Sequence, residues 1–200
     1  MKAIYFDVDG TLLHFTRAYD DLLADAFRTV EGEVRDEWLE TYNERFYDVF
    51  SACEPNPSRN AFATVSENPE ELLEELRERE VEACQPPERV HAHLEALSEE
   101  FKLGVLTNGV RSWQLRKLEA YDLDAHFDAI VSSYDAGVHK PDPEPFALAE
   151  RRLPADEYAM VGDSDDDIEG AAQVGWATHR YEEDGFGKLP EVFCWSSDLE

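Results

Sequence analysis

The stretch that decides the fold is Phe6-Asp7-Val8-Asp9-Gly10-Thr11-Leu12, which follows directly on the apolar run 3–5. A continuous apolar run of this kind is typical of a strand that is covered on both faces of a parallel sheet. Burying Asp7 at its end is costly unless a cation or hydrogen-bond donors receive the charge. Gly10 lets the chain turn, and we expect the Thr11 side chain to hydrogen-bond to the turn backbone. Acidic side chains at the carboxyl end of a strand lie where open α/β proteins place their active sites.

The composition indicates a folded chain whose 200 residues suffice for one domain, or for a core domain with a smaller insert. A hydrophobic content of 42% is too high for a chain that is disordered as a whole. The three cysteines are widely spaced and indicate reduced thiols rather than a disulfide framework. No apolar run has membrane-spanning length, and the first strand starts at residue 2 or 3. We therefore expect no signal peptide, no membrane association and a cytoplasmic protein.

The formal net charge is −28, from 46 acidic and 18 basic residues, and only five of the basic residues are lysines. This charge argues against nucleic acid or an anionic membrane as a partner. An acid-rich, lysine-poor surface resembles those of proteins from salt-loving organisms. Because the Debye length shrinks to roughly 3 Å at 1 M salt, the self-repulsion of such a surface largely disappears there. We therefore expect a halophilic protein whose fold and activity need roughly molar salt.

Residues 14–85 are predicted to form a helical domain that is inserted after the first strand. Apolar side chains recur there at helical spacing, with interruptions at Glu31-Gly32 and at Glu54-Pro55-Asn56-Pro57-Ser58. The last helix of the block is expected to begin at Asn68-Pro69. The aromatic side chains that we expect in its core are Trp38, Tyr42, Phe46, Tyr47 and Phe50.

From residue 86 onward strands and helices alternate, which predicts a parallel sheet with right-handed crossovers. The expected strands cover 101–106, 129–131, 158–161 and 176–179. The expected helices cover 88–99, 110–120, 145–152 and 165–174. The predicted fold class is α/β, with a Rossmann-like catalytic core formed by 1–13 and 86–200 and a helical cap formed by 14–85.

Three strand ends of the predicted sheet carry polar side chains, and a loop between two of them carries a lysine. Because the carboxyl ends of parallel strands share one edge, these side chains can form one site. Hard cations such as Mg²⁺ take oxygen ligands and are often held by one or two carboxylates. A carboxylate can also act as a nucleophile, and lysine, hydroxyl and amide donors suit the oxygens of a transferring phosphoryl group. The residues are Asp7, Asp9, Thr107, Asn108, Lys140 and Asp163.

Four motifs, in this order and at this spacing, resemble the signature of the haloacid dehalogenase (HAD) superfamily. They are Asp7-Val8-Asp9-Gly10-Thr11, Leu106-Thr107-Asn108-Gly109, Lys140-Pro141, and Gly162-Asp163 with Asp167 downstream. The chain resembles the branch with a helical cap after the first strand, which includes phosphoglycolate phosphatase-like enzymes. The resemblance covers the whole chain, although the cap matches only in helical character and position.

The resemblance implies a chemical role for each of the first acids. Asp7 would attack phosphorus and become an aspartyl-phosphate. Asp9 would protonate the leaving alcohol and then deprotonate the water that cleaves the intermediate. Mg²⁺ would be bound by the Asp7 carboxylate, the Asp9 backbone carbonyl and Asp163.

The same resemblance implies that Thr107 and the Asn108 backbone bind the phosphoryl oxygens, and that Lys140 neutralises the nucleophile and the phosphate. Asp167 has two open interpretations. It lies three residues after Ser164, in the position of a capping box, where Glu or Gln is more usual. It therefore either supports the metal site indirectly or only caps the following helix.

These observations predict a Mg²⁺-dependent phosphoric monoester hydrolase that acts on small phosphorylated metabolites. Family members that remove halide from 2-haloacids lack the second aspartate and need no metal. An acid at position 9 favours phosphate ester hydrolysis, because an alkoxide leaving group must be protonated. A phosphomutase or a 2-haloacid dehalogenase of the same superfamily is an alternative, and so is, from another class, a non-catalytic acidic partner-binding protein. The sequence leaves the substrate, the cap residues that set specificity and the oligomeric state open.

Overall fold

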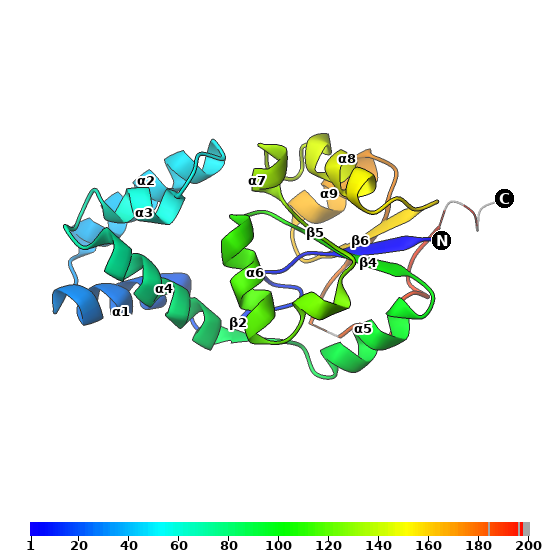
Figure 1. Ribbon diagram of the computed structural model, residues 1–200, viewed down its shortest axis with the longest axis horizontal. Coiled ribbons are helices and arrows are strands. Elements are labelled where there is room, and N and C mark those ends of the chain that lie inside the picture. The colour runs from blue at the N-terminus through cyan, green and yellow to red at the C-terminus, as the bar shows by residue number, and fades with distance from the viewer. Residues whose placement is uncertain (184, 196, 198–200) are drawn as a thin grey trace. The chain divides into compact units, whose positions relative to one another are not determined.

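The computed structural model describes residues 1–183, 185–195 and 197, and its contacts divide the chain into two units (Figure 1). The first unit combines Met1–His14 with Pro86–Glu200, and the second is Phe15–Gln85. The two-residue strands β2 (His14–Phe15) and β3 (Cys84–Gln85) pair where the chain passes into and out of the second unit. The sequence predicts these passages after residues 13 and 85, and the cap function of the second unit stays a prediction.

A five-stranded parallel sheet forms the centre of the first unit and confirms the predicted α/β fold class. Its strands, in spatial order, are β5 (Ala129–Ser132), β4 (Lys102–Thr107), β1 (Ala3–Phe6), β6 (Tyr158–Gly162) and β7 (Ala177–Arg180). All four side chains of β1 are buried, because both faces of a central strand are covered. Phe6 lies opposite Val105 and Val161, so the three central strands end at nearly the same level.

Each connection between the parallel strands passes through helices, as parallel pairing requires. The sequence does not predict the short helix α7, because four residues are too few to show a helical period. The connecting elements are α5 (Val90–Ser98), α6 (Arg111–Ala120), the 3₁₀ turn η1 (Asp124–His126), α7 (Ser133–Ala136), α8 (Pro143–Arg152) and α9 (Asp165–Gln173).

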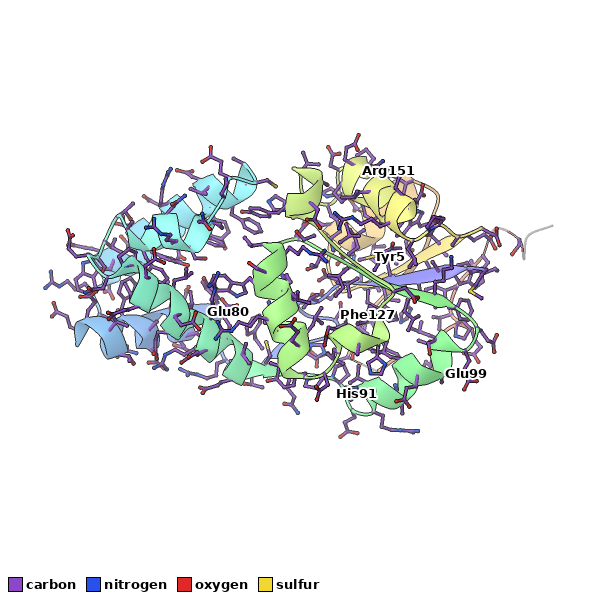
Figure 2. The ribbon with its side chains drawn as sticks, in the orientation of Figure 1. Tyr5, Glu80, His91, Glu99, Phe127 and Arg151 are labelled. Atoms are coloured by element: carbon purple, nitrogen blue, oxygen red, sulfur yellow. The ribbon has the colours of Figure 1, made fainter. Side chains whose placement is uncertain are left out.

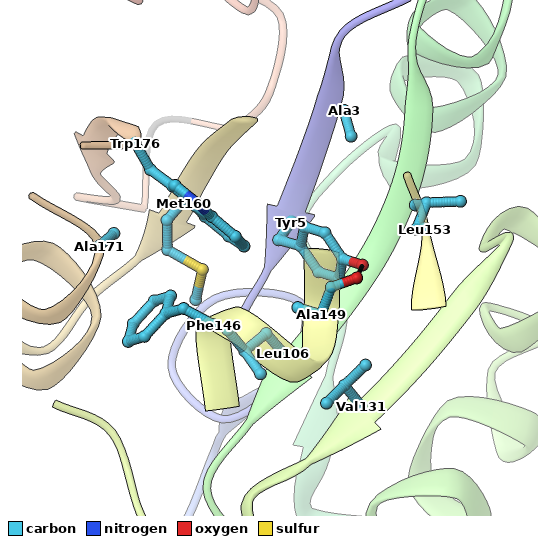
Figure 3. Close-up of a cluster of buried hydrophobic side chains, with 10 residues drawn as sticks. All are labelled: Ala3, Tyr5, Leu106, Val131, Phe146, Ala149, Leu153, Met160, Ala171 and Trp176. Atoms are coloured by element: carbon cyan, nitrogen blue, oxygen red, sulfur yellow. Dashed lines mark hydrogen bonds between the residues drawn. The ribbon is translucent and has the colours of Figure 1, made fainter. Parts of the chain in front are cut away.

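The core of the sheet is built around Tyr5, as Figure 3 shows. Its ring stacks on Trp176 with the centroids 5.3 Å apart, and its hydroxyl donates to the Ala149 carbonyl oxygen at 2.7 Å. A buried tyrosine hydroxyl needs such a partner. Gly104 on the neighbouring strand leaves the space that the ring occupies, since a Cβ there would overlap it. This packing holds β1, and therefore the loop that follows it, in a defined position.

The second unit is helical and consists of α1 (Tyr19–Glu31), α2 (Asp36–Ser51), α3 (Pro57–Phe62) and α4 (Pro69–Ala83). Tyr42 is fully buried and Phe46 and Phe50 are partly buried, but Tyr47 is 63% exposed. The prediction that Tyr47 belongs to the core is therefore wrong, because five positions after Tyr42 a helix presents a different face. Figure 2 shows Glu80, a buried acid of α4, among the side chains of this unit.

Among the described residues, no helix is both long and apolar enough to cross a membrane.

Candidate active site

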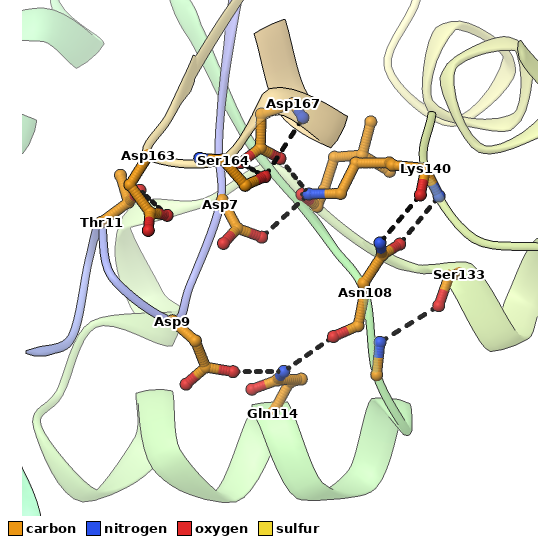
Figure 4. Close-up of polar contacts among 12 residues, drawn as sticks. Asp7, Asp9, Thr11, Asn108, Gln114, Ser133, Lys140, Asp163, Ser164 and Asp167 are labelled. Atoms are coloured by element: carbon orange, nitrogen blue, oxygen red, sulfur yellow. Dashed lines mark hydrogen bonds and ion pairs between the residues drawn. The ribbon is translucent and has the colours of Figure 1, made fainter. Parts of the chain in front are cut away.

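Polar side chains from three strand ends gather at the carboxyl edge of the sheet, within the first unit (Figure 4). Asp7 follows β1, Thr107 ends β4 and Asp163 follows β6. The Asp7 backbone N–H donates to the Val161 carbonyl oxygen at 2.9 Å, which joins the first of these ends to the third. Lys140 reaches the same place from the loop between α7 and α8. The topology thus brings together four residues that are far apart in the sequence, at the edge where α/β proteins bind ligands.

The ammonium group of Lys140 forms the centre of the site, and this residue is only 3% exposed. It donates to Asp7 Oδ1 at 2.9 Å, to Asp167 Oδ1 at 2.5 Å and to the Leu106 carbonyl oxygen at 2.7 Å. Three acceptors match its three donors, which is what a buried ammonium requires. Burial alone would lower the pKa of Lys140, but the adjacent carboxylates hold that pKa above its usual value. Lys140 is therefore a permanent cation beside Asp7.

The carboxyl group of Asp7 is strongly perturbed. Its pKa is raised to about 7, chiefly by burial and also by the charges of Asp167 and Asp9, while Lys140 opposes the shift. A carboxyl group must be ionised to act as a nucleophile. A bound cation would favour the ionised form and make Asp7 available for attack at neutral pH.

Three carboxylates form a cluster that fits a hard cation. Asp7, Asp163 and Asp167 each offer one oxygen, and these oxygens lie within 4.8 Å of one another. The loop after β1 is shaped to admit Asp163, because a Cβ on Gly10 would overlap its carboxylate. All-oxygen ligands are the set that Mg²⁺ takes. The residues present therefore fit the predicted Mg²⁺, and the cluster includes Asp167, which the sequence did not assign as a ligand.

Asp163 is held by neighbours on both sides. The Thr11 hydroxyl donates to its Oδ1 at 3.3 Å, and Arg180 Nη1 donates to its backbone carbonyl oxygen at 2.7 Å. The sequence predicts a bond from the Thr11 side chain to the turn backbone, whereas the structure shows a bond to the Asp163 carboxylate. Although much of Asp163 is exposed, loss of solvent around its carboxyl group raises the pKa of this residue. Thr11 and Arg180 thus fix the position of Asp163.

Asp167 caps α9, which is one of the two interpretations that the sequence left open, and it also contacts the central lysine. It completes a capping box with Ser164, since Asp167 N donates to Ser164 Oγ while Asp167 Oδ2 accepts from the Ser164 backbone N–H. Its other oxygen accepts from Lys140. One buried side chain therefore starts α9 and holds the central lysine.

Asn108 uses its side chain to position Lys140. Its Oδ1 accepts from the Lys140 backbone N–H at 2.9 Å, and its Nδ2 donates to the Lys140 carbonyl oxygen at 3.1 Å. The sequence assigned only the Asn108 backbone to the site, so this paired contact is an addition. Thr107 is buried at the end of β4, and its predicted phosphate contact stays a prediction.

Asp9 lies on the side of the site that faces α6 (Figure 4). Its Oδ2 accepts from Gln114 Nε2 at 2.8 Å, and its Oδ1 accepts from Lys117 Nζ at 2.5 Å. Its carboxylate is not a member of the three-acid cluster. The structure therefore separates Asp7 and Asp9, with one acid beside Lys140 and the other beside Lys117.

Residues 1–175 match the family model of the haloacid dehalogenase-like hydrolases. The chain belongs to this family. Membership confirms the predicted superfamily and makes the protein an enzyme of the hydrolase class. The matched residues of this haloacid dehalogenase-like hydrolase include all of the acids and lysines described above.

Curated relatives cover most of the chain. The chain is 30% identical over 183 residues to the pyrophosphatase PpaX of Halalkalibacterium halodurans, and the match spans 89% of this chain and 82% of that protein. It is 29% identical over 203 residues to the glyceraldehyde 3-phosphate phosphatase of Methanopyrus kandleri, where the match spans 90% and 83% respectively.

Solved structures of haloacid dehalogenase-like proteins share the fold. A HAD phosphatase from Thermococcus onnurineus is 27% identical, with a TM-score of 0.67 over 92% of this chain and 88% of that chain. A 2-haloacid dehalogenase from Pseudomonas syringae pv. Tomato is 26% identical, with a TM-score of 0.69 over 96% and 97%. The fold is thus common to both reaction classes, and the choice between them depends on the site.

Two residues of the site were missed from the sequence, namely Gln114 and Lys117. Both lie on the helix predicted at 110–120, where polar side chains are ordinarily assigned to a solvated face. The signal that could have found Lys117 was the scarcity of lysine, since it is one of only five in the chain. For Gln114 the sequence offers no comparable signal.

Proposed function

We propose that this hydrolase is a Mg²⁺-dependent phosphatase that cleaves small phosphate esters through an aspartyl-phosphate on Asp7. The observation that carries the proposal is the arrangement of Asp7 beside Lys140, within a cluster of three carboxylates. The names of the curated relatives, a pyrophosphatase and a sugar phosphate phosphatase, support the same chemistry. The proposed substrates are small phosphorylated metabolites. We propose that the helical unit is the cap that selects among them.

The proposed reaction has two steps that share one proton carrier. In the first step an Asp7 carboxylate oxygen attacks phosphorus, the bond from phosphorus to the leaving oxygen breaks, and that oxygen keeps the electron pair and takes a proton from Asp9. In the second step the oxygen of water attacks the same phosphorus while its proton passes to the Asp9 carboxylate. The bond from phosphorus to Asp7 then breaks, which returns the Asp7 carboxylate and releases phosphate.

The remaining residues stabilise charge during these steps. Lys140 already lies 2.9 Å from Asp7 Oδ1 and can neutralise the phosphoryl oxygens as they approach. Thr107 and the Asn108 backbone are proposed to donate to the same oxygens. Asp7, Asp163 and the Asp9 backbone carbonyl are the proposed Mg²⁺ ligands, and Asp167 is close enough to join them. A bound Mg²⁺ would supply charge neutralisation of the transferring phosphoryl group.

The site favours a phosphatase over a dehalogenase for two reasons. Halide departs as an anion and takes no proton, so in dehalogenation an acid at position 9 has no leaving group to protonate. A cluster of three carboxylates also carries more negative charge than Lys140 alone neutralises, which favours the binding of a further cation. Both features serve the hydrolysis of a phosphate ester.

The direct test is an assay of the purified chain at roughly molar KCl. The panel contains p-nitrophenyl phosphate, inorganic pyrophosphate, glyceraldehyde 3-phosphate, further small phosphate monoesters and 2-chloropropionate, each with Mg²⁺ or with EDTA. We expect release of phosphate with Mg²⁺, loss of this activity in EDTA, and no release of chloride. Metal-independent chloride release, transfer of the phosphoryl group within a sugar phosphate without net hydrolysis, or no turnover of any compound would each overturn the proposal.

A further inference from the structure

We infer that Gln114 and Lys117 are positioning residues, which fix the Asp9 carboxylate in the orientation that proton transfer needs. This inference rests on the proposed function, because it assumes that Asp9 is the proton carrier. It concerns the face of α6 that points to the site, and none of the four family motifs includes either residue.

The geometry is that of a two-point anchor. Gln114 and Lys117 are one helical turn apart on α6 and each holds a different oxygen of Asp9, at 2.8 and 2.5 Å respectively. Lys117 is 3% exposed, whereas the Asp9 side chain is 35% exposed. The anchored side of Asp9 is therefore covered, and its remaining surface is open for proton exchange. Two contacts on different oxygens fix the rotation of the carboxylate, which a single ion pair would not.

The orientation of the Gln114 amide follows from its neighbours. Its Nε2 faces Asp9 Oδ2 and, at 3.2 Å, the carbonyl oxygen of Asn108. Both neighbours are acceptors, so the amide nitrogen must point toward them. Its Oε1 is buried and accepts no hydrogen bond within the part of the chain that the structure describes. The two donations of the Gln114 amide are thus directed at Asp9 and at the turn that follows β4.

The energetics of α6 point the same way. Its buried side chains are Gln114, Lys117 and Leu118, so the helix turns an amide and an ammonium inward. Burying an ammonium is costly unless good partners receive it, and apolar residues of similar size would pack at lower cost. In a chain with five lysines, two are buried at this one edge, Lys117 on Asp9 and Lys140 on Asp7. Buried polar and charged side chains of this kind are expected where function requires them.

In the proposed reaction, the orientation of Asp9 matters in both steps. A misplaced carboxyl group neither delivers its proton to the leaving oxygen nor takes the proton of the attacking water. The first step depends on proton delivery by Asp9 only when the leaving group is unstable as an anion. p-Nitrophenolate is stable as an anion, so its departure needs no proton, whereas an alkoxide does. The second step needs Asp9 with every substrate.

The test compares Lys117→Met and Gln114→Met with the unaltered chain in the full-length protein, at molar KCl with Mg²⁺. A variant with a disoriented Asp9 should lose on the order of 10²-fold in kcat on an alkyl phosphate, with KM little changed. With p-nitrophenyl phosphate the first step should keep its rate while the second step slows. The variants should then release a burst of one p-nitrophenolate per molecule, followed by slow turnover.

Two further variants separate positioning from a general structural role. Lys117→Arg keeps a cation and should restore part of the lost turnover. Lys102→Met removes a lysine at the opposite end of β4, which donates to the Pro154 carbonyl oxygen, and should leave both rates unchanged. Equal losses of the first-step rate on both substrates, or unchanged turnover on the alkyl phosphate, would overturn the inference. Absence of phosphatase activity in the unaltered chain would instead overturn the proposed function.

Discussion

At the scale of single residues, two acids of the same loop have different surroundings, as their different proposed tasks require. Asp7 is buried beside Lys140, and its pKa is raised to about 7. Asp9 is half-buried and paired with Lys117. Sequence alone suggests two carboxylates two positions apart, and only the folded chain shows that each has its own lysine. This division suits one nucleophile and one proton carrier.

The first prediction concerns Asp9→Asn. An amide cannot carry the proton, so we expect kcat to fall by roughly 10²- to 10⁴-fold. The buried Lys117 also loses its counter-charge, so we expect a lower melting temperature for the variant. The assay is therefore run below the melting temperatures of both the variant and the unaltered chain. Steady-state kinetics and equilibrium binding of substrate provide the measurement. The matched control is Asp166→Asn, an exposed acid in the first turn of α9 with no assigned role. Undiminished turnover in Asp9→Asn would refute the assignment.

At the scale of elements, the sheet was predictable because its signal is local. The apolar runs that form β1, β4 and β6 are visible in the sequence, and so are the polar residues that end each strand. Partnerships across elements are not local. The Asn108 side chain bonds to the Lys140 backbone, and Thr11 bonds to Asp163, through contacts that only the register of the sheet creates. The inward face of α6 was missed for the same reason.

The second prediction concerns the loop after β1. Gly10 has a φ of +85°, and a Cβ there would overlap the Asp163 carboxylate. Gly10→Ala should therefore cost about 1–2 kcal/mol of unfolding free energy from backbone strain. Because it also displaces a proposed ligand, it should weaken Mg²⁺ binding about 10- to 100-fold. Denaturant unfolding and titration calorimetry with MgCl₂ measure the two effects.

Gly137→Ala is the control for that experiment. Gly137 has a φ of +79°, and a Cβ added there would meet open space, so the substitution introduces similar strain without touching the acids. It should lower the stability to a similar extent and leave Mg²⁺ affinity unaltered. Equal Mg²⁺ affinity in the two variants would show that the Gly10 loop does not shape the metal site.

At the scale of the whole molecule, the dominant property is a net charge of −28. Arginines do pair with acids at the surface, as in Arg17–Asp25 and Arg28–Asp25, but exposed pairs of this kind contribute little to stability. The surface ion pairs therefore offset little of the repulsion among the carboxylates. The Debye length falls from about 10 Å at 0.1 M salt to about 3 Å at 1 M.

The third prediction follows from that screening. The melting temperature and the specific activity should both rise as KCl increases from about 0.1 M to about 1 M. Circular dichroism melts and phosphate release measure them in parallel. The control is the same series of measurements with sucrose in place of KCl. Sucrose stabilises compact states by exclusion from the protein surface but does not screen charge. Full activity together with an unchanged melting temperature in dilute buffer would contradict the expectation of a salt-dependent fold.

The central claim is that Asp7 carries the phosphoryl group during turnover. The most direct measurement is to quench the enzyme in acid during turnover of p-nitrophenyl phosphate, reduce it with borohydride and map the product by mass spectrometry. Borohydride reduces an acyl phosphate to an alcohol, so the account predicts a homoserine in place of Asp7 only when substrate and Mg²⁺ are both present. Reduction at another acid, or turnover with no reducible intermediate at Asp7, would contradict it.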